Sequence, residues 1–144
     1  MAVGREARDK LLNGQKLYQE RARKALPILV ELAGKKAKIT YSELAERLGM
    51  PNPRNLNHVL YCIGSAIEEL SEDWHGDKYK IPPIEALVVN KNTRLPGAGI
   101  AYFIHEYTGN KAEKKKIMDE MGYKMIFDYP DWPLVLKELL QENG

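Results

Sequence analysis

Hydrophobic positions recur with a helical period from residue 5 to about residue 33. Gly14 is expected to loosen or break the first part of this helix. Pro27 is expected either to kink the second part or to begin a new helix at its first turn. Gly34 suits the position just after a helix end. The apolar positions that set the period are Leu11, Leu12, Leu17, Tyr18, Ala22, Ala25, Leu26, Leu29, Val30, Leu32 and Ala33.

The next pattern predicts a helix-turn-helix. Thr40 and Glu43 match a capping box, in which each side chain accepts a hydrogen bond from the backbone N–H of the other residue. A two-turn helix should follow and end at Gly49. Asn52 is then expected to cap a second helix, with Pro53 as its first residue.

This second helix is expected to run from Pro53 to about Leu70. Its buried stripe consists of Leu56, Val59, Leu60, Ile63, Ile67 and Leu70. At or beside the opposite face, near its beginning, lie Arg54, Asn55, Asn57 and His58. A helix that follows a short turn and presents such side chains near its N-terminus has the geometry that enters a DNA major groove.

A β-branched segment at residues 86–90 predicts a strand, and residues 91–94 predict a hairpin turn carrying Lys91 and Arg94. Together with the helix-turn-helix, this strand and hairpin would form a wing.

The remainder of the chain gives weaker patterns. Residues 100–107 fit either a strand or a short helix, residues 111–121 fit a charged helix, and residues 123–127 alternate like a strand. Asp131 is expected to cap a last helix, in which Trp132 would anchor the helix to the core.

The predicted elements indicate a helix-rich α+β fold, with a winged helix-turn-helix core and flanking N- and C-terminal helices. A length of 144 residues, 44% hydrophobic and 29% charged, is typical of one compact globular domain over residues 1–144. Within it we distinguish N-terminal helices at 1–34, the winged helix-turn-helix at 39–99 and an extension at 100–144.

Composition points to a cytoplasmic protein. No apolar run approaches the roughly 18 residues of a membrane span, so no membrane contact is expected. The N-terminus has no signal-peptide pattern, and the single cysteine cannot form an internal disulfide. The net charge is +2, but residues 1–40 hold ten Lys or Arg against four acidic residues. Such a basic segment suits either a polyanion or a solvated helix face.

The segment Ile39-Thr40-Tyr41-Ser42-Glu43-Leu44-Ala45 and the later Ile81-Pro82, Leu87-Val88-Val89-Asn90 and Gly97 carry a family resemblance. Residues 39–99 resemble the DNA-binding half of the alkylguanine-DNA alkyltransferases and alkyltransferase-like proteins. The resemblance implies a winged helix that binds duplex DNA, with Tyr41 at the family tyrosine that helps to rotate a nucleotide out of the duplex.

The sequence departs from this family at the reactive positions. The family's nucleophilic Cys, its His and its Arg fall on Pro83, Ile84 and Glu85, and none of these can accept an alkyl group. The family's arginine finger falls on Asn57. Alkyl transfer is therefore not expected. The chain also resembles small uncharacterised bacterial winged-helix proteins, through segments that include Asp128-Tyr129-Pro130-Asp131-Trp132.

Other candidate chemistry is sparse. Cys62, in the middle of the second helix, is expected to be buried and unreactive. Asp73, His75 and Asp77 match no standard metal spacing. His105 and Glu106 are neighbours in sequence, so they should not face one another as an acid–base pair. The sequence therefore implies no cofactor, no metal and no assigned catalytic residue.

These observations lead to the expectation of a non-enzymatic protein that binds duplex DNA. Its contacts would come from the helix-turn-helix, the hairpin and the basic segment before them: Tyr41, Arg54, Asn55, Asn57, His58, Lys91, Arg94, Lys35, Lys36 and Lys38. Two alternatives remain open: a protein-interaction module, which the acidic end of the second helix favours, and an enzyme acting on nucleic acid, such as a nuclease or a toxin-like effector.

Overall fold

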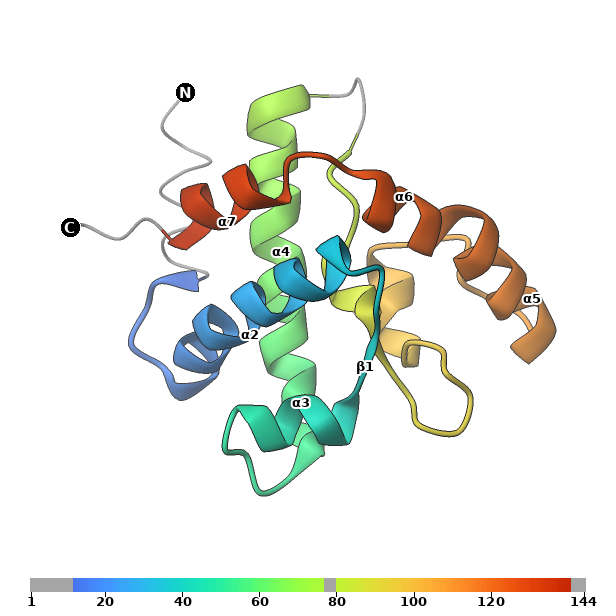
Figure 1. Cartoon of the computed structure of the whole chain (residues 1–144), viewed down its shortest axis with the longest axis horizontal. Helices are drawn as coiled ribbons and strands as arrows, with labels where there is room; N and C mark the ends of the chain where they lie inside the picture. The colour runs from blue at the N-terminus through green and yellow to red at the C-terminus, as the bar shows by residue number, and fades with distance from the viewer. Residues whose placement is uncertain (1–11, 77–79, 141–144) are drawn as a thin grey trace.

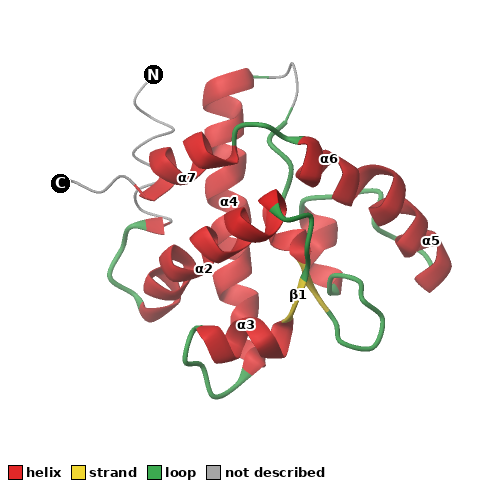
Figure 2. Ribbon diagram, viewed as in Figure 1, coloured by secondary structure: helices red, strands yellow, loops and turns green. Residues whose placement is uncertain are grey.

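The computed structural model describes residues 12–76 and 80–140, and these are mostly helical (Figures 1 and 2). The α-helices are α2 (Leu17–Gly34), α3 (Tyr41–Arg47), α4 (Leu56–His75), α5 (Lys111–Ile117), α6 (Tyr123–Asp128) and α7 (Trp132–Leu140). The strands are β1 (Ile39–Thr40) and β2 (Val88–Val89). Shorter helices are η1 (Pro53–Asn55), η2 (Ile84–Leu87), η3 (Ala98–Tyr102) and the π-helix η4 (Met118–Gly122). The expected helix-rich α+β class is confirmed.

Helix α4 passes through the middle of the molecule and α2 packs across it (Figure 1). The predicted apolar stripe of α4 is buried throughout, at Leu56, Val59, Leu60, Ile63, Ile67 and Leu70. The facing side of α2 buries Ala22, Ala25, Leu26, Leu29 and Ala33. These two stripes meet because each has the 3.6-residue period that places apolar side chains on one helix face. The helix α4 continues to His75, beyond the expected end near Leu70.

The first predicted helix differs from expectation in two places. Pro27 lies inside α2 and does not begin a new helix. Burial of the neighbouring Leu26 and Leu29 stabilises the helix and offsets the free energy lost with the hydrogen bond that a proline cannot make. Gly34 was expected just after the helix end but is the last residue of α2, and the residue with a left-handed backbone after the helix is Lys36, with φ 54°.

The expected interruption near Gly14 is present, since residues 13–16 form a bend before α2. The Arg23 guanidinium fastens this bend by donating to the carbonyl oxygens of Leu12 and Gly14, each at 2.7 Å. Residues 5–11 of the predicted helix lie outside the described residues.

The two strands pair in parallel, Ile39 with Val88 and Thr40 with Val89. The expected turn at residues 91–94 is present, because the Asn90 N–H donates to the Leu95 oxygen and the Arg94 N–H donates to the Asn90 oxygen, both at 2.8 Å. A hairpin with a second antiparallel strand is absent from the described residues, and the chain after the turn enters η3. Pro96 helps to end the pairing there, because it has no N–H for a strand ladder.

The C-terminal segment is helical throughout its regular elements. Residues 123–127, predicted as a strand, form most of α6. The buried residues of α6 are Tyr123 and Ile126, whose spacing of three residues fits a helix. The alternation of apolar and polar residues in this short segment fitted a strand equally well. Residues 98–102 form η3, which resolves the ambiguity at residues 100–107 in favour of a short helix.

Helix α7 begins directly after Asp131, as predicted, and packs on both α2 and α4. Trp132 is buried, and its Nε1–H donates to the Ile126 carbonyl at 2.8 Å. The expected role of Trp132 as an anchor is confirmed. Among the helices that the structure describes, none has the length and apolar character needed to cross a bilayer.

Candidate functional site

Local hydrogen bonds that the sequence predicts fix the start of α3 and the turn between α3 and α4. The Glu43 N–H donates to Thr40 Oγ1 at 3.1 Å, and the Thr40 N–H donates to Glu43 Oε1 at 3.0 Å. The hydrogen bond from the Thr40 N–H to its carboxylate holds the pKa of Glu43 below its usual value. Asn52 Oδ1 accepts from the Arg54 N–H at 3.0 Å. The chain then enters α4 through η1, so this end of α4 is presented on a fixed turn.

The predicted groove-reading residues Arg54, Asn55, Asn57 and His58 are all exposed at this end of α4. Two of them have additional neighbours. The His58 ring lies 6.2 Å from the Tyr18 ring of α2, and Asn57 lines a cavity described below. The structure therefore brings the four side chains to one region.

Lys38 and Arg94, both predicted to contact DNA, lie near one another. Lys38 Nζ is 3.8 Å from the centre of the Tyr123 ring. Burial lowers the pKa of Lys38, the Asp119 carboxylate opposes this shift, and the charges of Arg94 and Lys115 add to it. Lys91 is exposed in the same turn as Arg94. Asp119, which pairs with Lys115, is an acidic residue near this small basic group.

Lys35 and Lys36 are placed differently. They directly follow the last residue of α2. Lys35 Nζ forms an ion pair with Glu31 at 2.8 Å, which lowers the pKa of Glu31, and the charge of Arg47 of α3 also lowers this pKa. The positive charge of Lys35 is therefore partly neutralised.

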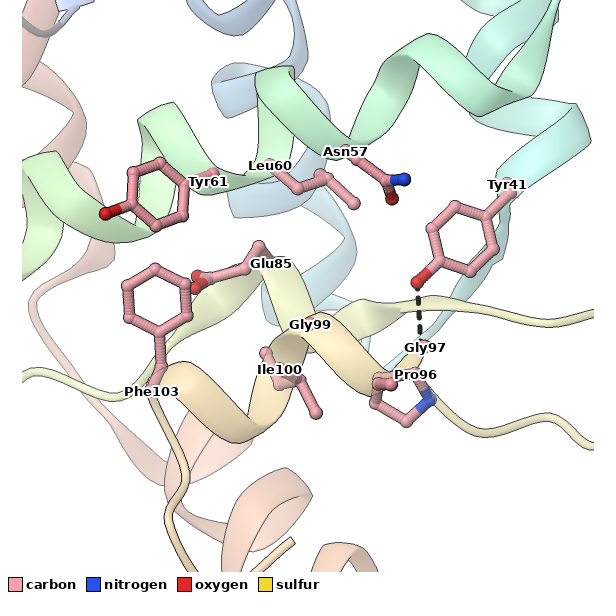
Figure 3. A pocket seen from close by; sticks show the side chains of 11 residues that line it. Tyr41, Asn57, Leu60, Tyr61, Glu85, Pro96, Gly97, Gly99, Ile100 and Phe103 are labelled. Atoms are coloured by element: carbon pink, nitrogen blue, oxygen red, sulfur yellow. Dashed lines mark hydrogen bonds between the residues drawn. The ribbon is translucent and has the colours of Figure 1, made fainter.

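Tyr41 joins two segments that are far apart in the sequence. Its hydroxyl oxygen accepts a hydrogen bond from the Gly97 N–H at 2.8 Å (Figure 3). Burial raises the pKa of Tyr41. The Tyr41 hydroxyl can still donate its own proton, but its oxygen is already bonded to Gly97. The adjacent Pro96 carbonyl oxygen accepts a hydrogen bond from the buried Tyr107 hydroxyl at 2.5 Å. The hydrogen bond between Tyr41 and Gly97 thus joins two segments that line a cavity.

This cavity has a volume of about 400 Å³ and lies beside the beginning of α4 (Figure 3). Helices α3 and α4 supply one wall with Tyr41, Asn57, Leu60 and Tyr61. The turn and η3 supply the opposite wall with residues 96–100, and Glu85 and Phe103 close one end. Its size and its mixture of aromatic, aliphatic and few polar groups are typical of a small-ligand site.

Glu85 is the chemically unusual residue of this cavity. Its side chain is 4% exposed, and neither carboxyl oxygen has a partner in hydrogen-bonding geometry among the described residues. Burial raises the pKa of Glu85 to about 8; its own backbone N–H opposes the shift and the Glu68 charge adds to it. A Cβ atom at Gly64 would overlap this carboxyl group and the Phe103 ring, so the glycine makes room for both.

Sequence reasoning missed Glu85 as a site residue. The sequence does contain one signal, which is a single acidic residue within the apolar run from Ile81 to Val89. Acidic residues are rarely found inside a buried segment unless they are paired. The residues that line the cavity come from segments that are distant in the sequence, so no local sequence pattern predicts the cavity.

The remaining candidates have ordinary surroundings. Cys62 is buried as predicted, and burial raises the pKa of its thiol to about 11, which disfavours a thiolate nucleophile. His105 and Glu106 line a second cavity of about 290 Å³. The described residues contain no group of three or more potential metal-binding side chains, and Asp77 lies outside them.

Comparison with protein-family models finds no match to this chain, and comparisons with curated proteins and with solved structures also find none. The resemblance to alkyltransferase-like proteins therefore stays a prediction from sequence.

Proposed function

We propose that the protein binds duplex DNA without catalysing a reaction, with the beginning of α4 in the major groove. The observation that carries this proposal is the exposed run of Arg54, Asn55, Asn57 and His58 on a capped turn after α3. Arg and Asn side chains can form paired hydrogen bonds to base edges, which makes them suited to reading sequence.

In this proposal the loop at residues 90–95 takes the place of the wing. Lys91 and Arg94 on the loop, with Lys38 beside Arg94, would contact backbone phosphates. The acidic partners in this region reduce its net charge, so the affinity would depend mainly on α4. Lys35 and Lys36 would add attraction at longer range rather than direct contacts.

The test is fluorescence anisotropy of a labelled duplex of about 20–30 bp, long enough for one helix-turn-helix site. Binding should weaken as salt rises, because each neutralised phosphate releases counterions. The double variant Arg54→Ala/Asn57→Ala should bind on the order of tenfold more weakly or worse, since each lost base contact is worth about 1–3 kcal/mol.

Lys137→Ala is the matched control, because it also removes one positive charge but lies exposed on α7. It should bind DNA nearly as the unmodified protein does. Equal losses in the two variants would assign binding to net charge and overturn a specific role for α4. An anisotropy change that does not depend on salt concentration, or no binding at low salt, would overturn the proposal of DNA binding itself.

An interaction with another protein is the second candidate function. Met121 and Met125 are 40% and 48% exposed and line the second cavity, next to His105 and Glu106. Exposed methionines at an apolar hollow are typical of adaptable interaction surfaces. Copurification of a defined partner that is lost on Met125→Asp, combined with no DNA binding, would favour this function.

A further inference from the structure

The end of the first cavity combines a buried carboxyl group with two aromatic rings. The Tyr61 and Phe103 rings lie with centroids 5.9 Å apart and inclined at 48°, and Figure 3 shows the Glu85 carboxyl group at the edge of the Phe103 ring. Both carboxyl oxygens lack a hydrogen-bond partner among the described residues. The opposite end of the cavity presents the polar groups of Asn57 and Tyr41.

This arrangement is costly for the protein by itself. A buried carboxyl group without a partner opposes folding, and so does a glycine in the interior of a helix. Both features occur at the same point, because Gly64 of α4 leaves the space that the Glu85 carboxyl group and the Phe103 ring occupy. An alanine and an apolar side chain would fill the core more stably. The two features together indicate a site that is completed by a ligand.

We propose that this cavity binds a small organic cation with N–H donors, such as an amidinium or guanidinium, and that Glu85 is its counter-ion. Two parallel N–H groups of such a cation match the two oxygens of a carboxylate. Both oxygens of Glu85 are buried, so a side chain that covers them would move aside when the cation enters. The planar cation would lie against the Tyr61 and Phe103 rings, which attract positive charge. Asn57 and Tyr41 would then contact the distal end of the ligand.

The charge of the cation decides the protonation state of Glu85. Without a ligand the carboxyl group is neutral near pH 7, because burial and the Glu68 charge both oppose its ionisation. Tyr41 of α3 and Tyr61 of α4 also line the site, and a tyrosine side chain carries no positive charge. The bound cation supplies it, so Glu85 releases its proton to solvent and the ion pair forms.

Affinity for a permanent cation should therefore rise with pH and level off above the pKa of Glu85. Between pH 6.5 and 8.5 the fraction of ionised Glu85 increases on the order of tenfold, and the dissociation constant should fall by a similar factor. Calorimetry in buffers with different ionisation enthalpies should show close to one proton released per ligand bound at the lower pH.

The experiment is isothermal titration calorimetry with benzamidinium and with benzamide, which has nearly the same shape but no charge. The unmodified protein should bind benzamidinium at least about tenfold more tightly than benzamide, as expected for a charge-assisted pair. Glu85→Gln keeps the side-chain shape and should remove both this preference and the pH dependence. Glu46→Gln, an exposed acid on α3, should change neither.

Phe103→Leu gives a second, independent variant. It leaves the carboxyl group in place and should weaken benzamidinium binding severalfold by removing one ring. Equal binding of the two probes, or benzamidinium binding that persists in a folded Glu85→Gln variant, would overturn the proposal. Preference for a neutral nucleoside, such as guanosine, over benzamidinium would instead assign the cavity to a nucleobase. The cavity shares Asn57 with the proposed DNA-contacting residues, but Glu85→Gln and Phe103→Leu leave Arg54 and Asn57 unchanged, so the two proposals can fail separately.

Discussion

Burial sets the ionisation of Glu85 apart from that of the exposed acids of this chain. Its pKa of about 8 in the folded state lies well above the value of roughly 4.3 expected in the unfolded chain. A group whose folded pKa is raised contributes stability that is fully present below the unfolded pKa and is lost as pH rises through the folded pKa. The neutral side chain is compatible with the cavity, whereas the ionised one is not.

Glu85→Gln should therefore become more stable relative to the unmodified protein as pH rises. The difference in free energy of unfolding should widen by up to about 1.4 kcal/mol per pH unit between roughly pH 5 and pH 8, and stay constant above that. Urea denaturation at several pH values measures it. A difference that does not change with pH would show that Glu85 titrates normally in the folded protein.

At the scale of elements, capping decides where α3 begins and therefore how α4 is presented. The sequence predicts this part well: the Thr40–Glu43 capping box, the Asn52 cap and the buried stripe of α4 are all present. These features depend on residues within one or two turns of each other, which is why they can be recognised without the rest of the molecule.

Thr40→Ala should lower the free energy of unfolding by about 1 kcal/mol, because the N–H of Glu43 loses its acceptor at the helix start. Thr40→Ser should restore most of this stability. Ser42→Ala, an exposed change on the same helix, should stay within about 0.5 kcal/mol of the unmodified protein. Thermal or urea unfolding would show it, and equal effects of the two alanine changes would argue against the cap.

Elements defined by pairing between distant segments were predicted less well. Residues 86–90 were predicted to be a strand, but only Val88–Val89 form one, and residues 86–87 belong to η2. The strand pairs with β1 in parallel rather than with a second hairpin strand. Residues 123–127 alternate like a strand yet form helix α6, because five residues are too few to separate a period of two from a period of 3.6.

At the scale of the whole molecule, α7 completes the core that α2 and α4 begin. Trp132, Val135 and Leu139 are its buried residues, and they belong to the same apolar cluster as the stripe of α4. Helix α4 and the C-terminal extension are therefore joined by packing, and the extension contributes to the stability of the helix that begins directly after Arg54 and Asn55 of η1.

Leu139→Ala should destabilise the protein by about 2–5 kcal/mol, because Leu139 is 1% exposed and its truncation leaves a cavity. Leu134→Ala, the same change on the same helix, should cost less than about 1 kcal/mol, since Leu134 is 56% exposed. Chemical denaturation of the two variants makes the comparison. Similar small losses would mean that α7 is not part of the cooperative core.

The sequence by itself determined the helix-rich class, the helix-turn-helix with its caps, the buried stripe of α4 and the anchoring tryptophan. Each follows from the spacing of apolar residues along one helix or from hydrogen bonds between near neighbours. The tertiary structure alone decided the parallel pairing of β1 with β2 and the cavity around Glu85. The cavity joins α3, α4, η2 and η3, and the environment that keeps its carboxyl group neutral arises when these distant segments exclude water together.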